Sequence, residues 1–449
     1  MCFKDNYRKY KEEAIELLRN LISFESVLDE YNPNSDEPFG IENKKALNYL
    51  LNKASEDGFI VKNVDNYAGH IEYGTGDEIL GILAHLDVVP VDKSEWISYP
   101  FKLDIRNGKM YGRGTMDDKG PLVCAYIAMK MLKDMGFKPK RTIRLIVGCD
   151  EESGSRCLEH YLECEKRPDL GFSPDAAFPL IYGEKGMASV DVLAPLDDEI
   201  IDFKAGTRYN MVPSMAMMRI KSCLDNEYLE YLKENDYLGE IKDGYYIAYG
   251  KAAHAMCPHE GLNAIYILFD FLNKHTSSKI AQFIKEYFLF ETNSESLVGY
   301  EVYDEEMKYL TCNLAIASVC ENTIKLGYNF RLPLDSNHEL LEESFKKAVS
   351  KYGYKFNIIS KSNRHYVSKD SELVKSLMKA YQMVTEDFDN EPYTIGGGTY
   401  AREIGNAVAF GPMFVGREDV CHIANEYIYE EDFDKSLEIY FNAIFELTK

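Results

Sequence analysis

One stretch of the chain, residues 79–120, constrains the fold more than any other part. It begins with the apolar run ILGILA at residues 79–84, which ends abruptly at His85-Leu86-Asp87. Because the run lacks polar alternation, it predicts a strand that is buried on both faces, as in a parallel sheet. Polar residues at the carboxyl end of such a strand lie where open α/β sheets bind ligands. We therefore expect an α/β fold with a ligand site beside His85.

The order of strand, polar residues and helix recurs along the chain. Residues 121–135 predict a helix that ends at Gly136, and an apolar strand at 142–148 is followed by Asp150-Glu151-Glu152. His70 is expected to lie between two short strands and to be structural. The alternation is typical of an α/β domain. Further elements are expected as helices at 4–22, 43–57 and 157–163, and as two strands within 59–73.

The pattern changes after residues 184–186. Residues 187–370 mix strands with helices in no regular alternation, and the α/β pattern returns at 371, with a last helix at 431–447. We predict an α/β domain formed by residues 1–186 and 371–449, with a mixed, mostly parallel sheet flanked by helices. It is interrupted by an inserted α+β domain at 187–370.

Composition excludes several classes of protein. A formal net charge of −23 argues against a nucleic-acid partner, because such proteins need basic stripes. The longest apolar runs fall far short of the roughly 20 residues of a membrane span. Residues 1–6 lack the apolar core of a signal peptide, and the ten cysteines form no Cys-x-x-Cys pair. We expect a cytoplasmic protein that has neither a nucleic-acid nor a membrane partner.

Separated residues of metal-ligand type follow the predicted strands and loops. They are His85, Asp117, Glu152, Asp175 and His422. Imidazole and carboxylate donors suit two borderline-hard divalent ions, each with three protein ligands if one carboxylate is shared. Asp87 is placed to orient the His85 ring. Glu151 is adjacent to a ligand but surplus to the set, so it can accept a proton from a metal-bound water.

Several motifs, taken in order, resemble the M20 family of metallopeptidases. They are HLDVVP at 85–90, GRGTMDDKGP at 112–121, DEESG at 150–154, SPDAAFP at 173–179 and EKG at 184–186. The sequence PFG at 38–40, Trp96 and the long insert make the chain most similar to the PepV-type dipeptidases, also called Xaa-His dipeptidases or carnosinases. The resemblance runs nearly from end to end.

The resemblance implies a catalytic di-metal domain, an inserted lid domain and two divalent metal ions. Zinc is the expected metal, with manganese or cobalt as alternatives. By this match Asp117 bridges the ions and joins Asp118 through a cis peptide bond, Glu151 is the general base, and Asp87 supports His85. The other ligands fall into two pairs, His85 with Asp175 and Glu152 with His422.

The resemblance also assigns residues that bind the substrate. Asn210 contacts it, His254 polarises the scissile carbonyl, and Arg331 binds the substrate carboxylate. Backbone contacts are expected from Gly397, Gly398 and Thr399 in the run that begins at Gly396. Met256-Cys257 departs from the small residues expected after the histidine, which affects the predicted side-chain preference.

The predicted function is a metal-dependent dipeptidase that cleaves unblocked dipeptides through a bridging water activated by two metal ions. An N-acyl amino-acid deacylase of the acetylornithine or succinyl-diaminopimelate type is the alternative on the same fold. The larger insert and the PFG sequence favour the dipeptidase. A metal-binding scaffold without catalysis is a third reading, and Glu151 argues against it. The long insert resembles a lid enlarged to replace a second subunit, so we expect a monomer.

Overall fold

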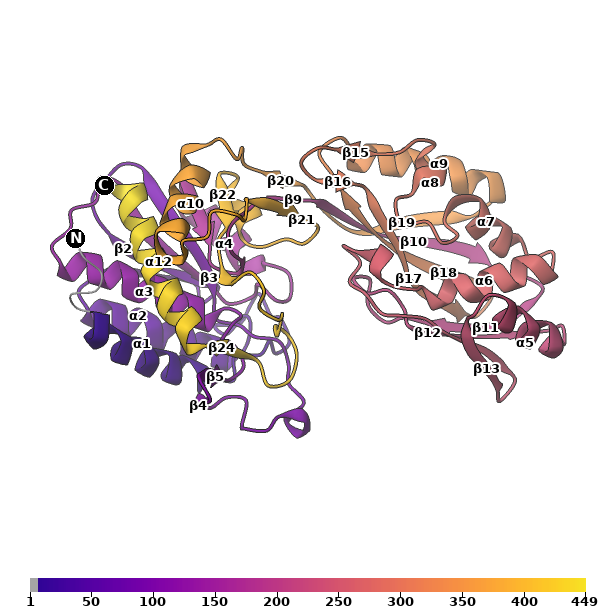
Figure 1. The fold of residues 1–449 in the computed structure, drawn as a ribbon, viewed down its shortest axis with the longest axis horizontal. Helices are drawn as coiled ribbons and strands as arrows, with labels where there is room; N and C mark the ends of the chain where they lie inside the picture. The colour runs from indigo at the N-terminus through magenta and orange to yellow at the C-terminus, as the bar shows by residue number, and fades with distance from the viewer. Residues whose placement is uncertain (1–6) are drawn as a thin grey trace. The chain divides into compact units, whose positions relative to one another are not determined.

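The structure, a computed structural model, describes residues 7–449 and divides the chain into two compact units (Figure 1). Unit 1 comprises the described residues up to Gly183, together with Tyr366–Tyr393 and Gly398–Lys449. Unit 2 comprises Glu184–His365 and Thr394–Gly397. The predictions made for residues 1–6 lie outside the described part of the chain.

A mixed sheet forms the centre of unit 1, in the order β1-β2-β6-β3-β7-β22-β9-β20, with β21 paired to β9. The strands are β1 (Ile60–Val64), β2 (Ala68–Tyr73), β3 (Ile79–His85), β6 (Thr142–Gly148), β7 (Leu170–Ser173), β9 (Ile181–Glu184), β20 (His365–Tyr366), β21 (Tyr393–Ile395) and β22 (Ala407–Ala409). β6, β3, β7 and β22 are adjacent and parallel to one another, whereas β2 pairs antiparallel with both β1 and β6. Every residue of β3 and β6 is buried, as their unbroken apolar sequences predict.

Helices cover the sheet of unit 1. They are α1 (Tyr7–Ile22), α2 (Ile41–Glu56), α3 (Lys119–Asp134), α4 (Arg156–Cys164), α10 (Glu372–Thr385), α11 (Ala401–Ile404) and α12 (Glu430–Thr448). α12, drawn in yellow, packs against α3 and α10 (Figure 1). Its first turn carries Glu430, Glu431 and Asp432, whose negative charges interact favourably with the positive end of the helix dipole and stabilise the helix. Gly136 follows α3 with φ +75°, a conformation that suits glycine at a helix end.

Short elements complete unit 1. They are η2 (Lys93–Glu95), β4 (Asp104–Arg106), β5 (Lys109–Tyr111), β8 (Ala176–Ala177), β23 (Pro412–Met413) and β24 (Tyr427–Tyr429). β24 pairs with β5, and β23 pairs with β8. These pairings join the C-terminal part of the chain to the loops that follow β3 and β7.

Unit 2 is built on an antiparallel sheet in the order β13-β14-β12-β11-β17-β18-β10-β19. Its strands are β10 (Gly186–Pro195), β11 (Ile200–Ala205), β12 (Met215–Ile220), β13 (Leu238–Lys242), β14 (Tyr245–Tyr249), β17 (Thr311–Cys320), β18 (Thr323–Leu332) and β19 (Lys355–Ser362), with the small pair β15 (Tyr303–Asp304) and β16 (Lys308–Tyr309) apart from it. Its helices are α5 (Asp225–Glu234), η3 (Pro258–Glu260), α6 (Ala264–His275), α7 (Lys279–Tyr287), α8 (Glu295–Val298) and α9 (His338–Tyr352). α6 begins where the Asn263 side chain accepts a hydrogen bond from the Ile265 N–H.

The predicted fold class, a mixed α/β protein, is confirmed: β6, β3, β7 and β22 are the parallel strands of the large sheet of unit 1, and the short strands β8 and β23 form a further parallel pair. One local prediction is wrong: His70 lies within β2 and not between two strands. It is buried, and its Nδ1 lies 2.8 Å from the Tyr161 hydroxyl of α4, so it joins the sheet to that helix. None of the helices in residues 7–449 has the length and apolar character to cross a bilayer.

Candidate metal centre

The candidate ligands of unit 1 follow the carboxyl ends of neighbouring parallel strands. His85 is the last residue of β3, Glu152 follows β6, and Asp175 follows β7. Because these strands are parallel neighbours, their carboxyl ends meet at one edge of the sheet. Asp117 comes from the loop before α3, and His422 from the loop before β24.

The carboxylate of Asp117 lies between two histidines. Its Oδ1 is 2.9 Å from His85 Nε2, and its Oδ2 is 3.0 Å from His422 Nε2. Asp175 Oδ2 is 3.6 Å from the same nitrogen of His85, and Glu152 Oε2 is 3.1 Å from that of His422. Two ligand clusters result, and Asp117 belongs to both. The structure thus brings all five predicted metal ligands together.

The pKa values of the ionisable groups in the centre are shifted from their usual values by burial and by the neighbouring charges. Burial, followed by the charge of Asp117, raises the pKa of Glu152 to about 7. Burial and Asp117 also raise the pKa of Asp175. Hydrogen bonds to Asp117 and Glu152 raise the pKa of His422 to about 11. Carboxylates crowded in this way need positive charge between them, and imidazole nitrogens with carboxylate oxygens form a donor set that fits divalent ions.

Asp87 contacts both the His85 ring and the segment after β6. The sequence predicts that Asp87 orients His85. In the structure the backbone oxygen of Asp87 lies 2.9 Å from His85 Nδ1, and the Asp87 carboxylate lies 3.5 Å from the same nitrogen. With Nδ1 donating, Nε2 faces the ligand position. The Asp87 carboxylate accepts hydrogen bonds from the backbone N–H groups of Glu151 and Glu152, at 3.1 and 3.0 Å. One residue thus positions a ligand and the candidate base.

Glu151 lies among charged groups of the centre. Burial and the charge of Asp175 raise the pKa of its carboxyl group well above the usual value. The peptide bond between Asp117 and Asp118 is cis, as the resemblance implies. The buried Asp118 carboxylate accepts a hydrogen bond from the backbone N–H of His85 at 3.1 Å, which fastens the Asp117 loop to the end of β3.

Glu426 supports the Asp117 loop and was not predicted from the sequence. Its fully buried carboxylate accepts backbone N–H bonds from Gly114, Met116 and Asp117 at 2.8–3.2 Å. It also accepts a hydrogen bond from Arg113 Nη1 at 2.7 Å, and both side chains are almost completely buried. The only sequence signal is an acidic residue four positions after His422, because all its partners lie about 310 residues earlier.

The predicted substrate residues divide between the two units. Gly398 and Thr399 belong to unit 1, whereas Asn210, His254, Arg331 and Gly397 belong to unit 2. Within unit 2 the segments that carry Asn210 and His254 run side by side. A bridge joins Met211 to His254, and the Ala255 N–H donates to the Asn210 backbone oxygen at 2.8 Å.

Arg331 is a buried residue of β18, with 4% of its surface exposed. Its Nε donates to Asn329 Oδ1 at 2.9 Å, and its Nη1 donates to the Gly396 carbonyl at 2.7 Å. Two such bonds fix the plane of the guanidinium group. A cavity of about 770 Å³ within unit 2 is lined in part by Gly396, Met256 and Cys257. Met256 and Cys257, which stand where the resemblance implies small residues after His254, therefore line this cavity.

The Glu426 contacts generate a prediction. Glu426→Gln leaves the buried Arg113 without its counter-charge, so we expect the free energy of unfolding to fall by about 3 kcal/mol. Metal affinity should fall as well, because an amide keeps only one of the two acceptor oxygens that hold the Asp117 loop and Arg113. Urea unfolding and metal titration measure the two effects. Glu418→Gln, at an exposed position of the same region, is the control, and equal behaviour of the two variants would contradict the assignment.

Comparison with known proteins agrees with this architecture. The family model described as "Peptidase family M20/M25/M40" matches residues 81–446. A Staphylococcus saprophyticus protein named "Putative dipeptidase" is 38% identical over 466 residues, covering 99% of each chain. The solved structure of human carnosine dipeptidase 1 has a TM-score of 0.60 at 17% identity, covering 98% of this chain and 97% of that one. The di-peptidase Dug1p of Saccharomyces cerevisiae has a TM-score of 0.58 at 16% identity, with the same coverage, and both likenesses show the fold. The chain belongs to the M20/M25/M40 family of peptidases, metallopeptidases that use divalent metal ions.

Proposed function

We propose that the protein is a dipeptidase that hydrolyses unblocked dipeptides with the help of two divalent metal ions. The observation that carries the proposal is the Asp117 carboxylate, whose two oxygens contact His85 and His422 in two different ligand clusters. Support for dipeptides as substrates comes from the relative named "Putative dipeptidase", which matches along the whole chain. The deacylase alternative shares the ligand set but requires a blocked amino group.

The residues of the centre fit two ions. His85 and Asp175 would hold one, Glu152 and His422 the other, and Asp117 would contact both. Zinc is the metal we propose, with manganese or cobalt as alternatives, since all three accept imidazole and carboxylate donors. Two such ions, when bound, supply Lewis acidity for the scissile carbonyl and lower the pKa of the attacking water.

The side chains then have separate tasks. Glu151, held by the Asp87 carboxylate through its backbone N–H, accepts the proton of the attacking water and delivers it to the leaving amine. His254 donates to the carbonyl oxygen as negative charge develops there. Arg331, with its guanidinium plane fixed by Asn329 and Gly396, binds the terminal carboxylate of the substrate. Asn210 and the backbone of residues 397–399 position the peptide.

We also propose a monomeric, cytoplasmic enzyme in which unit 2 acts as a lid. The length of unit 2 supports the monomer, because it offers the surface that a second subunit would otherwise provide. The buried free thiols of Cys124, Cys149 and Cys157 in unit 1 suit a reducing compartment. The unit 2 cavity beside Met256 and Cys257 is where we expect side-chain preference to be set.

The substrate class is tested with the metal-loaded protein. Free dipeptides of varied side chains and N-acetyl amino acids are supplied in parallel, with and without a chelator, at several enzyme concentrations. We expect hydrolysis of the free dipeptides only, loss of activity with the chelator, and constant specific activity on dilution. Hydrolysis of the N-acetyl amino acids alone would establish the deacylase instead, and activity lost on dilution would contradict the monomer.

The role of Glu151 is tested by Glu151→Gln. Loss of the general base should lower kcat by about 10²–10⁴-fold while both ions remain bound, because Glu151 is not among the five ligands. Metal content measured by mass spectrometry separates loss of the base from loss of metal. Glu163→Gln, an exposed change on α4, is the control. A metal-replete Glu151→Gln protein with full activity would rule out the assignment.

Substitutions of His254 and Arg331, the two proposed lid residues, should affect different kinetic parameters. Loss of a donor to the developing charge predicts that His254→Ala lowers kcat by about 10²–10³-fold. Arg331→Lys keeps the charge but loses the planar fork, so it should mainly raise KM for dipeptides. Metal content should match that of the parent in both variants, and His275→Ala, at an exposed histidine at the end of α6, should behave as the parent. Near-normal kcat in His254→Ala, or loss of metal, would show that His254 has another role.

A further inference from the structure

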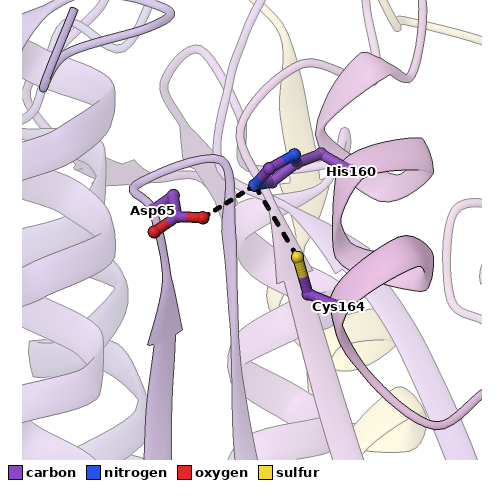
Figure 2. A group of neighbouring side chains, drawn as sticks. All are labelled: Asp65, His160 and Cys164. Atoms are coloured by element: carbon purple, nitrogen blue, oxygen red, sulfur yellow. Dashed lines mark hydrogen bonds and ion pairs between the residues drawn. The ribbon is translucent and has the colours of Figure 1, made fainter.

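A second cluster of metal-ligand side chains lies on the surface of unit 1. Asp65, His160 and Cys164 converge in Figure 2, with Asp65 Oδ2 2.9 Å and Cys164 Sγ 3.9 Å from His160 Nε2. All three ligand atoms lie within 4.8 Å of one another. None of these residues belongs to the centre around Asp117, and the proposed hydrolysis uses none of them.

The fold positions the three side chains from two directions. His160 and Cys164 are four residues apart on α4, so they lie on the same face of the helix. Asp65 begins the turn between β1 and β2, where Asp65 and Asn66 have φ values of +51° and +58°. Asparagine and aspartate tolerate this left-handed conformation better than most residues. The turn therefore directs Asp65 toward α4 without straining a bulky residue.

Two further contacts hold the turn against the helix. The Tyr67 ring packs on the His160 ring, with centroids 4.2 Å apart and planes at 32°. Lys62 of β1 forms an ion pair with Glu165, the residue that follows α4. The histidine ring is thus fixed by an aromatic neighbour, while its Nε2 edge faces the carboxylate and the thiol. His160 is half-buried and both other side chains are exposed, so an ion from solvent can reach them.

The contacts favour metal binding over a nucleophilic cysteine. A relay of the Cys-His-Asp type requires the thiol and the carboxylate to approach different ring nitrogens. Here Asp65 and Cys164 both approach Nε2. Three donor atoms that converge on one point are the arrangement a metal ion needs.

The distances fit a tetrahedral ion. Zinc bond lengths place a nitrogen and an oxygen ligand about 3.4 Å apart, and a nitrogen and a sulfur ligand about 3.6 Å apart. The observed separations are 2.9 Å for His160 to Asp65 and 3.9 Å for His160 to Cys164, so small side-chain rotations suffice. Thiolate, imidazole and carboxylate together select a zinc-class ion over magnesium or calcium.

We propose that Asp65, His160 and Cys164 form a third metal site, which binds Zn²⁺ with three protein ligands and leaves the fourth position to water. The Cys164 thiol releases its proton to solvent when the ion binds. The ion would join α4 to the β1–β2 turn. α4 begins at Arg156, whose guanidinium pairs with Asp150 at 2.6–2.7 Å, so the site braces the helix that follows the segment of Glu151 and Glu152.

Cobalt substitution tests the site on the full chain. Co²⁺ is titrated into the protein, and we expect a thiolate-to-cobalt charge-transfer band that ligands of nitrogen and oxygen alone do not give. Cys164→Ser should abolish this band and reduce bound Zn²⁺ from three ions to two, while dipeptide hydrolysis stays unchanged. Cys223→Ser and Cys320→Ser, at exposed thiols of unit 2, are matched controls that should keep the band.

Other outcomes would overturn the site. A wild-type titration with no thiolate band, or a band that persists in Cys164→Ser, excludes Cys164 as a ligand. A band that is lost only in Cys421→Ser would assign the thiolate to the residue beside His422. Asp65→Asn and His160→Ala must each weaken Zn²⁺ binding, and unchanged affinity in both would also contradict the proposal. The cobalt band and the amount and affinity of bound Zn²⁺ do not depend on the substrate, so these readouts remain informative even if the protein is not a dipeptidase.

Discussion

The contact of one carboxylate with two imidazoles is the constraint on which the site depends. Asp117 reaches His85 with one oxygen and His422 with the other, and these residues come from the end of β3, a loop before α3 and a loop before β24. Burial and then the charge of Asp117 raise the pKa values of Glu152 and Asp175, so three carboxylates in this space disfavour one another's charged forms. The arrangement is therefore stable when positive charge lies between them, which is the condition that two divalent ions meet.

Buried groups behind the ligands maintain this geometry. Glu426 binds the backbone of the Asp117 loop, Asp118 binds the backbone of His85, and Asp87 binds the backbone of Glu151 and Glu152. Each is an acceptor for N–H groups that lie in loops or at the end of a strand and lack a partner in the sheet or a helix. Loops that carry ligands usually need such support, because no regular hydrogen-bond ladder holds them. The supporting carboxylates are as much a part of the centre as the ligands themselves.

Local sequence signals predicted the elements that bury their side chains uniformly. The runs that form β3 and β6 contain no polar alternation, and both strands lie where that pattern places them. The candidate ligands were identified because they follow such strands or lie in motifs shared with the family. His70 was misplaced because its glycine neighbour suggested a turn, whereas Gly69 lies in β2.

The contacts that were missed are nonlocal. Glu426 and Arg113 are 313 residues apart, so no window of sequence connects them. Asp65 meets His160 across 95 residues, and only the i, i+4 spacing of His160 and Cys164 is visible in the sequence. The acceptor role of the Asp87 backbone oxygen depends on how the chain turns after β3, which residue types alone do not specify. Residue types predicted which side chains can bind a metal ion or transfer a proton, and the fold determines which of these side chains come into contact.

Anomalous X-ray diffraction from crystals of the zinc-loaded protein tests the central claim most directly. The account predicts two strong peaks at the Asp117 centre, one beside His85 and Asp175 and the other beside Glu152 and His422, with the Asp117 carboxylate between them and apart from any peak at Asp65, His160 and Cys164. Metal bond lengths of about 2.0–2.2 Å to both oxygens of Asp117 would establish the bridge. A single peak at this centre, or two peaks there of which only one contacts Asp117, would contradict it.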